Sequence, residues 1–112
     1  MVKLPASNKS VVGRRLREAR LRAGIAQDRL GVMIGLDEGS SSARMSRYET
    51  GIHEPPLHII HLLARVLRVP AAYFYAEDDN LAEWILMFNQ LKSSERKVLL
   101  DSATSVLDRA TK

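Results

Sequence analysis

Apolar residues recur at helical spacing along most of the chain. Val12, Leu16 and Ala19 are four and three positions apart, and arginines fill most of the positions between them. Gly24 follows at the place where helices commonly end. We find no stretch that alternates apolar and polar residues between turn signals, as a half-buried strand does. The pattern therefore predicts an all-α chain whose first helix spans residues 10–23.

The same criteria predict six further helices. We expect them at residues 27–34, 41–50, 56–68, 70–75, 81–91 and 95–110. The Gly- and Ser-rich stretch at residues 36–42 is interpreted as a turn. A polar run at residues 77–80 separates the first five helices from the last two. We therefore predict an N-terminal arm at residues 1–9, a five-helix domain at residues 10–75 and a helical extension at residues 80–112.

The second and third predicted helices, joined by a turn and flanked by helices, follow the helix-turn-helix plan. Several motifs agree with this plan in order: Arg-x-x-x-Gly at 20–24, Gln27, Ser-Arg-Tyr-Glu-x-Gly at 46–51, Pro55, and Leu-Ala-x-x-Leu-x-Val at 63–69. Together they resemble the lambda-repressor-like, XRE-type helix-turn-helix family over residues 10–75. The resemblance implies a five-helix domain that binds double-stranded DNA with its third helix in the major groove.

The resemblance also implies a set of DNA contacts. On the recognition helix the matching residues are Ser41, Ser42, Ala43, Arg44 and Arg47. Arginine donates two hydrogen bonds to guanine O6 and N7, and alanine packs on the thymine methyl group. Gln27 and Thr50 match positions that contact the phosphate backbone. Arg20 and Glu49 match an ion pair that ties the first helix to the third, so we interpret these two residues as structural.

One spacing departs from the family's pattern. Gly35 and Glu49 are 14 positions apart, about four more than is common in the resembling family. The extra residues fall at positions 37–42. Either the turn is longer, or the third helix begins earlier. The choice decides whether residues 41–43 face DNA.

Charge is distributed unevenly along the chain. The net charge is +4, but residues 1–75 hold 12 Lys and Arg against 6 Asp and Glu, whereas residues 76–112 hold 5 against 7. The basic part indicates a polyanionic partner, either nucleic acid or anionic lipid. The acidic, apolar remainder indicates a protein contact. No stretch approaches the roughly 18 apolar residues of a membrane span, and the N-terminus lacks an export signal, so we expect a cytoplasmic, nucleoid-associated protein without membrane contact.

Other kinds of chemistry have weaker signals. The chain has no Cys, which excludes disulfides, Cys-ligated zinc and thiol catalysis. His58 and His61 lie three positions apart with Glu54 nearby, but without a third strong ligand we interpret them as solvent-facing residues rather than metal ligands. There is no nucleophile motif and no Gly-rich phosphate loop. We therefore predict no enzymatic activity, no metal and no cofactor.

The last two predicted helices carry apolar residues that nothing in the sequence covers. These are Leu81, Trp84, Ile85, Phe88, Leu99, Val106 and Leu107. Self-association would bury them, and a two-fold dimer would read a near-palindromic DNA site. The prediction is therefore a homodimeric transcriptional regulator, more often a repressor in the resembling family. Two alternatives remain open: an antitoxin-like protein whose last helices bind a different protein, and a restriction–modification controller, which differs in its DNA target.

Overall fold

The computed structural model describes residues 10–111, and all regular structure in this range is helical. The prediction of an all-α chain is confirmed. The predicted arm at residues 1–9 lies outside the described residues. In chain order the elements are α1 (Val11–Ala23), α2 (Gln27–Met33), α3 (Glu38–Thr50), α4 (Leu57–Leu67), the 3₁₀ helix η1 (Ala71–Tyr75), α5 (Asp79–Gln90) and α6 (Ser93–Ala110).

The helix ends follow from local chemistry. The Ser10 hydroxyl caps α1 by accepting a hydrogen bond from the Gly13 amide at 3.0 Å. Gly24 ends α1 and Gly51 ends α3, both with the left-handed backbone that glycine adopts readily. Arg68 ends α4 at φ 58°, a conformation uncommon for a residue with a side chain.

The start of α3 differs from the sequence prediction. The helix begins at Glu38 rather than at residue 41, so the extra residues form an additional first turn of α3 instead of a longer loop. Local propensity favours a turn here, because serine side chains compete for backbone hydrogen bonds and glycine loses much backbone entropy in a helix. The extra turn itself is largely exposed, but Ser41, which follows it, is buried and bonds to α2.

One apolar core holds α1 to α4, η1 and part of α5. Its fully buried members include Leu16, Leu30, Met45, Ile60 and Leu63. Tyr73 and Phe74 of η1 complete it, with their rings edge to face at a centroid distance of 5.8 Å. The helix α5 joins this core through Ala82 and Leu86. The core therefore extends past the predicted five-helix domain into the first of the two added helices.

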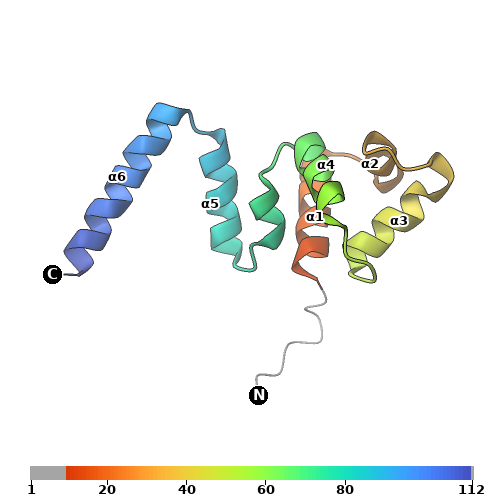
Figure 1. Ribbon diagram of the computed structural model, residues 1–112, viewed down its shortest axis with the longest axis horizontal. Coiled ribbons are helices and arrows are strands. Elements are labelled where there is room, and N and C mark those ends of the chain that lie inside the picture. Colours follow the sequence, from red (N-terminus) through yellow and green to blue (C-terminus); the bar gives the residue numbers. More distant parts are fainter. Residues whose placement is uncertain (1–9, 112) are drawn as a thin grey trace, which may run out of the picture.

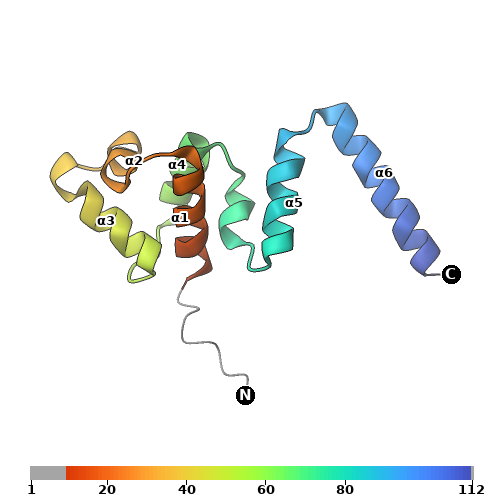
Figure 2. The same ribbon diagram turned by 180° about the vertical axis from the view of Figure 1, so that it is seen from behind.

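The molecule is elongated, with extents of 58 × 41 × 22 Å. Along the longest axis α2 and α3 lie at one end, α1, α4 and η1 in the middle, then α5, and α6 at the other end (Figures 1 and 2). The helix α6 diverges from α5 and points away from the rest of the chain. None of its residues is buried.

Candidate nucleic-acid interface

The helix α3 has one buried face and one exposed face. Ser41, Met45 and Tyr48 point into the core, at spacings of four and three residues. The opposite face is formed by Ala43, Arg47 and Thr50, all of which are exposed. Ser42 and Arg44 are exposed at the two sides of this outward face. The helix α3 lies at the end of the molecule opposite α6 (Figure 1), and the side chains of its outward face are left exposed by the rest of residues 10–111.

Ser41 is not part of the outward face. It is fully buried, and its hydroxyl donates a hydrogen bond of 2.6 Å to the carbonyl of Asp28 in α2. The prediction that the Ser41 side chain contacts DNA is therefore wrong. The reason is the extra turn of α3, which places position 41 against α2 instead of toward solvent.

Two glycines allow α3 to lie very close to its neighbours. A Cβ atom added at Gly31 of α2 would lie 1.8 Å from Ser41 Oγ. A Cβ atom at Gly13 of α1 would lie 2.5 Å from the Glu49 carbonyl oxygen and 2.7 Å from that of Tyr48. Real Cβ contacts are never this short, so both helix crossings require glycine. They fix α3 between α1 and α2.

A buried ion pair joins α1 to the end of α3. Arg20 Nε donates to Glu49 Oε2 at 2.5 Å and Arg20 Nη2 donates to Glu49 Oε1 at 3.1 Å, a bidentate geometry. The hydrogen bond with Glu49 raises the pKa of Arg20 above its ordinary value. Arg20 Nη1 also donates to the carbonyl of Ile25 at 3.0 Å. The structure thus brings together the two residues that the sequence paired.

Gln27 lies at the first position of α2 and is half-buried. Its Nε2 atom donates to Glu49 Oε1 at 3.2 Å, so the side chain belongs to the same polar cluster as Arg20. The sequence predicts that this side chain contacts a phosphate. In the structure its amide is directed at Glu49 near the end of α3.

The remaining predicted contact residues lie on α3 with different partners. Arg44 Nη2 donates to the Tyr48 hydroxyl at 3.3 Å. The Arg47 carbonyl accepts from the His53 amide at 3.2 Å, but the Arg47 side chain has no hydrogen bond with another described residue. The Thr50 hydroxyl donates to the carbonyl of Ser46 at 2.9 Å, one turn earlier in the helix. The exposed Gly39 and the half-buried Ser46 border the outward face and are not among the predicted contact residues. Their spacing from Ala43, four positions before and three after, was the signal, but it required the true start of α3.

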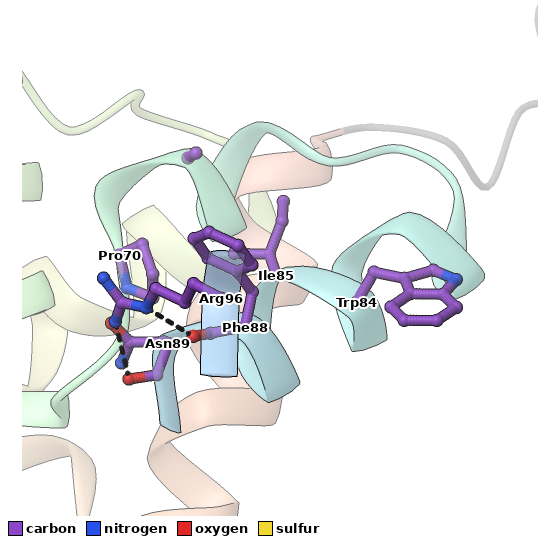
Figure 3. A pocket seen from close by; sticks show the side chains of 7 residues that line it. Pro70, Trp84, Ile85, Phe88, Asn89 and Arg96 are labelled. Atoms are coloured by element: carbon purple, nitrogen blue, oxygen red, sulfur yellow. Dashed lines mark hydrogen bonds between the residues drawn. The ribbon is translucent and has the colours of Figure 1, made fainter. Parts of the chain in front are cut away.

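The helices α5 and α6 expose a second, apolar surface. Leu81, Trp84, Phe88, Leu99, Val106 and Leu107 are exposed, with Trp84 at 58% and Leu107 at 64%, whereas Ile85 is half-buried. A cavity of about 520 Å³ lies beside α5, and Figure 3 shows the side chains that line it. At this cavity the Arg96 guanidinium lies over the Phe88 ring, 4.9 Å from its centroid. A second cavity of about 380 Å³ lies between Trp84 and Phe88 of α5 and the apolar side of α6.

The rest of the described structure offers little other chemistry. His58 and His61 are both exposed on α4, and within residues 10–111 no three metal-ligating side chains come together. Among these residues no helix combines the length and the apolar character needed to cross a membrane.

Comparison with known proteins agrees with this arrangement. A family model described as a helix-turn-helix domain matches residues 11–73, more than half of the chain. Among solved structures, the crystal structure of transcriptional regulator BswR matches with 43% sequence identity and a TM-score of 0.83, over 87% of this chain and 96% of that chain. Curated protein sequences give no match. The chain therefore belongs to the XRE-like helix-turn-helix family of DNA-binding transcriptional regulators.

Proposed function

We propose that this protein is a sequence-specific regulator that inserts α3 into the DNA major groove as a homodimer and acts as a repressor. The observation that carries the proposal is the outward face of α3. It holds two arginines, is rigidly held by α1 and α2, and is exposed among the residues that the structure describes.

The chemistry of this face suits the major groove. Arg47 is free to place its guanidinium on a guanine, and Ala43 one turn earlier offers a methyl group for a thymine. Arg44 donates to the Tyr48 hydroxyl and is exposed at the side of this face, so we assign it to a phosphate contact. Ser42 and Thr50 supply hydroxyl groups at the edges of the same face.

The apolar surface of α5 and α6 supports the proposed dimer. Soluble monomers seldom leave a patch of this kind uncovered, and α6 buries no residue against its own chain. A second copy is the simplest cover, because a two-fold axis brings the same patch from both copies together. Residues 10–75 would then read DNA, while residues 80–112 would join the copies.

A dimer of this form places its two α3 helices at the outer ends, because α3 and α6 lie at opposite ends of each chain (Figure 2). Two-fold related recognition helices read two half-sites that are one helical turn, about 34–36 Å, or a multiple of it apart. Occupation of such a site across a promoter excludes polymerase, which is the basis for the repressor role. No cofactor is needed for this action, and it takes place where the DNA lies, in the cytoplasm on the nucleoid.

Selection from a random duplex library tests this function. The purified protein is used to enrich binding sequences, and hydroxyl-radical footprinting then maps the protected positions on the enriched duplex. We expect an inverted repeat with two protected stretches on one face of the DNA. Absence of any enriched sequence would contradict the proposal.

The apolar surface also admits a different protein as its partner, as in an antitoxin-like role. Sedimentation of the purified chain separates the two cases. A concentration-dependent mass of two chains supports the homodimer. A stable monomer over the micromolar range would contradict the homodimer and leave the surface to a heterologous partner.

A further inference from the structure

Arg15 of α1 is a charged residue in an almost fully buried position. Its side chain is 3% exposed, although the helical pattern places it off the apolar stripe. Arg15 Nε donates to the carbonyl of Ala76 at 2.8 Å and Nη2 donates to the carbonyl of Glu77 at 3.2 Å. These two carbonyls belong to the segment of residues 76–78 that leads from η1 into α5. The arginine therefore holds the junction between the DNA-reading domain and the added helices.

Carboxylates complete the binding of this arginine. Arg15 Nη1 lies 2.9 Å from Glu18 Oε2, and Nη2 lies 3.0 Å from Asp79 Oδ1 at the start of α5. Arg14 supports the same junction from the surface. Its Nη1 atom lies 3.3 Å from Asp79 Oδ1, and its Nη2 atom donates to the Glu77 carbonyl at 3.2 Å. We call this group of Arg14, Arg15, Glu18 and Asp79 the junction clamp.

The junction clamp also contacts the core. The Tyr73 hydroxyl donates to Glu18 Oε2 at 3.1 Å, and the Arg15 guanidinium lies 5.8 Å from the Tyr73 ring centroid. Burial alone would lower the pKa of Arg15, but its hydrogen bonds with Glu18 and Asp79 raise the pKa above its ordinary value. Among the described residues every buried side-chain polar atom has a hydrogen-bond partner, so the clamp is fully satisfied.

The helix α1 connects this clamp with the recognition helix. Gly13 lies against the backbone of Tyr48 and Glu49, and Arg20 forms the ion pair with Glu49, so α1 and α3 form one unit. Arg15 lies between these two contacts on α1 and forms an ion pair with Asp79 at the start of α5. Figure 1 shows α1 placed between α3 on one side and η1 with α5 on the other.

We propose that Arg15 is a positioning residue that sets the angle of α5 relative to α3 and thereby selects the spacing between the two DNA half-sites. The inference rests on the proposed homodimer. The angle depends on directional contacts, because apolar contacts such as those of Ala82 and Leu86 constrain a helix less tightly than hydrogen bonds with fixed geometry. At the far end of α5, Asn89 adds one exposed hydrogen bond to the Arg68 carbonyl at 3.3 Å.

Spin labels provide a direct test, since the chain has no native cysteine. The exposed His61 on α4 is replaced by Cys and labelled, and the distance between the two labels of the dimer is measured by double electron–electron resonance. The same proteins are titrated with duplexes whose half-sites are separated in steps of one base pair. The labelled protein with an intact junction clamp should give one narrow distribution of label distances and should prefer one spacing between the DNA half-sites.

Arg15→Met removes the directional contacts and keeps an apolar side chain of similar length. We expect a broadened distance distribution and at least a tenfold loss of discrimination between spacings, with binding to a single half-site changed less than twofold. Asp79→Ala serves as a second variant that spares the buried position, because the Asp79 side chain is exposed. Asp79→Ala should broaden the distribution of label distances less than Arg15→Met does. The control is Arg17→Met, an exposed arginine of α1 outside the clamp.

The outcomes separate the two proposals. A folded Arg15→Met dimer with unchanged distance and spacing preference would overturn the positioning role while leaving the proposed function intact. A parent protein without dipolar coupling that sediments as a monomer would overturn the homodimer and the spacing role together.

Discussion

Gly31 of α2 and Ser41 of α3 lie in direct contact, so closely that a Cβ atom at position 31 would be 1.8 Å from Ser41 Oγ. The serine hydroxyl uses this proximity to donate to the carbonyl of Asp28, one turn earlier in α2. The contact sets the angle between the two helices of the helix-turn-helix unit. It also explains how a helix that begins three residues earlier than predicted still docks on α2.

We expect Gly31→Ala to destabilise the protein by about 2 kcal/mol, because the added methyl group overpacks the contact and displaces α3. Urea unfolding monitored by circular dichroism measures the change. The matched control is Gly39→Ala in the extra turn of α3, where an added Cβ meets nothing within 4 Å. That control should be neutral or stabilising by up to about 1 kcal/mol, since alanine favours helix. Equal effects of the two substitutions would refute the packing argument.

Local pattern predicted helices well where apolar spacing was regular, as in α1 and α4. It failed at residues 38–40, because Gly and Ser have weak local helix propensity, and the contact of the following Ser41 with α2 is a tertiary effect. The outward face of α3 was therefore assigned with Ser41 in it and without Ser46. Helical spacing could have separated the two faces only after the start of the helix was known.

The pair of Arg20 and Glu49 should show strong coupling. Glu49→Gln leaves the Arg20 charge without its carboxylate in a site where the Glu49 side chain is only 3% exposed. We expect a loss of about 3 kcal/mol in unfolding free energy, because an unpaired buried charge is costly. A double-mutant cycle with Arg20→Met tests this. The double variant should be less destabilised than the sum of the two singles, and strict additivity would contradict a direct interaction.

Tyr73 gives the protein a pH dependence at the alkaline end. Burial, followed by the charge of Glu18, raises the pKa of Tyr73 above its ordinary value of 10.0. The unfolded chain therefore loses this proton first, and the stability held by the neutral tyrosine declines as the pH rises from about 10 through the folded-state pKa.

Tyr73→Phe removes both the hydrogen bond to Glu18 and this titration. At pH 7 we expect a loss of about 1.5 kcal/mol, which is typical of a hydrogen bond to a charged group. The difference from the parent protein should shrink in unfolding experiments above about pH 10. A difference that stays constant with pH would show that the raised pKa of Tyr73 has no part in stability.

Arg15 illustrates a second limit of sequence analysis. A charged residue off the apolar stripe is usually exposed, so the pattern assigned Arg15 to the surface. In the structure its charge is satisfied by Glu18 one turn later in α1 and, from the segment that leads into α5, by two carbonyls and the carboxylate of Asp79. The acidic run Glu77-Asp78-Asp79 was a signal for such a partner, but periodicity alone does not show which basic residue it meets.

Trp84 should be central to self-association. We expect Trp84→Ala to weaken the dimer at least about tenfold, because a large, exposed aromatic side chain commonly dominates an interface. Sedimentation equilibrium at several concentrations measures the dissociation constant. Met33→Ala removes an exposed apolar side chain of α2, at the opposite end of the molecule from α6 (Figure 1), and should leave the dimer unchanged. Dissociation constants that are the same for Trp84→Ala and the parent protein would count against this interface.

Arg47 should contribute directly to base recognition. We expect Arg47→Ala to weaken binding to the selected duplex by about 1–3 kcal/mol and to relax preference at one base pair of each half-site. Fluorescence anisotropy with a panel of single-base variants measures both effects. Arg109→Ala, in the exposed last turn of α6, removes the same charge at the other end of the molecule. A uniform loss across all duplexes would instead assign Arg47 to the phosphate backbone.

The most direct test of the account is a titration of the protein with its selected duplex and with a scrambled duplex of equal length, at two salt concentrations. We predict tight binding to the selected duplex, with an affinity that falls by about 10³-fold between 50 and 200 mM salt as phosphate contacts release counterions. The scrambled duplex should bind at least about 10³-fold more weakly at the same salt. Equal binding to both duplexes would contradict sequence-specific recognition by α3.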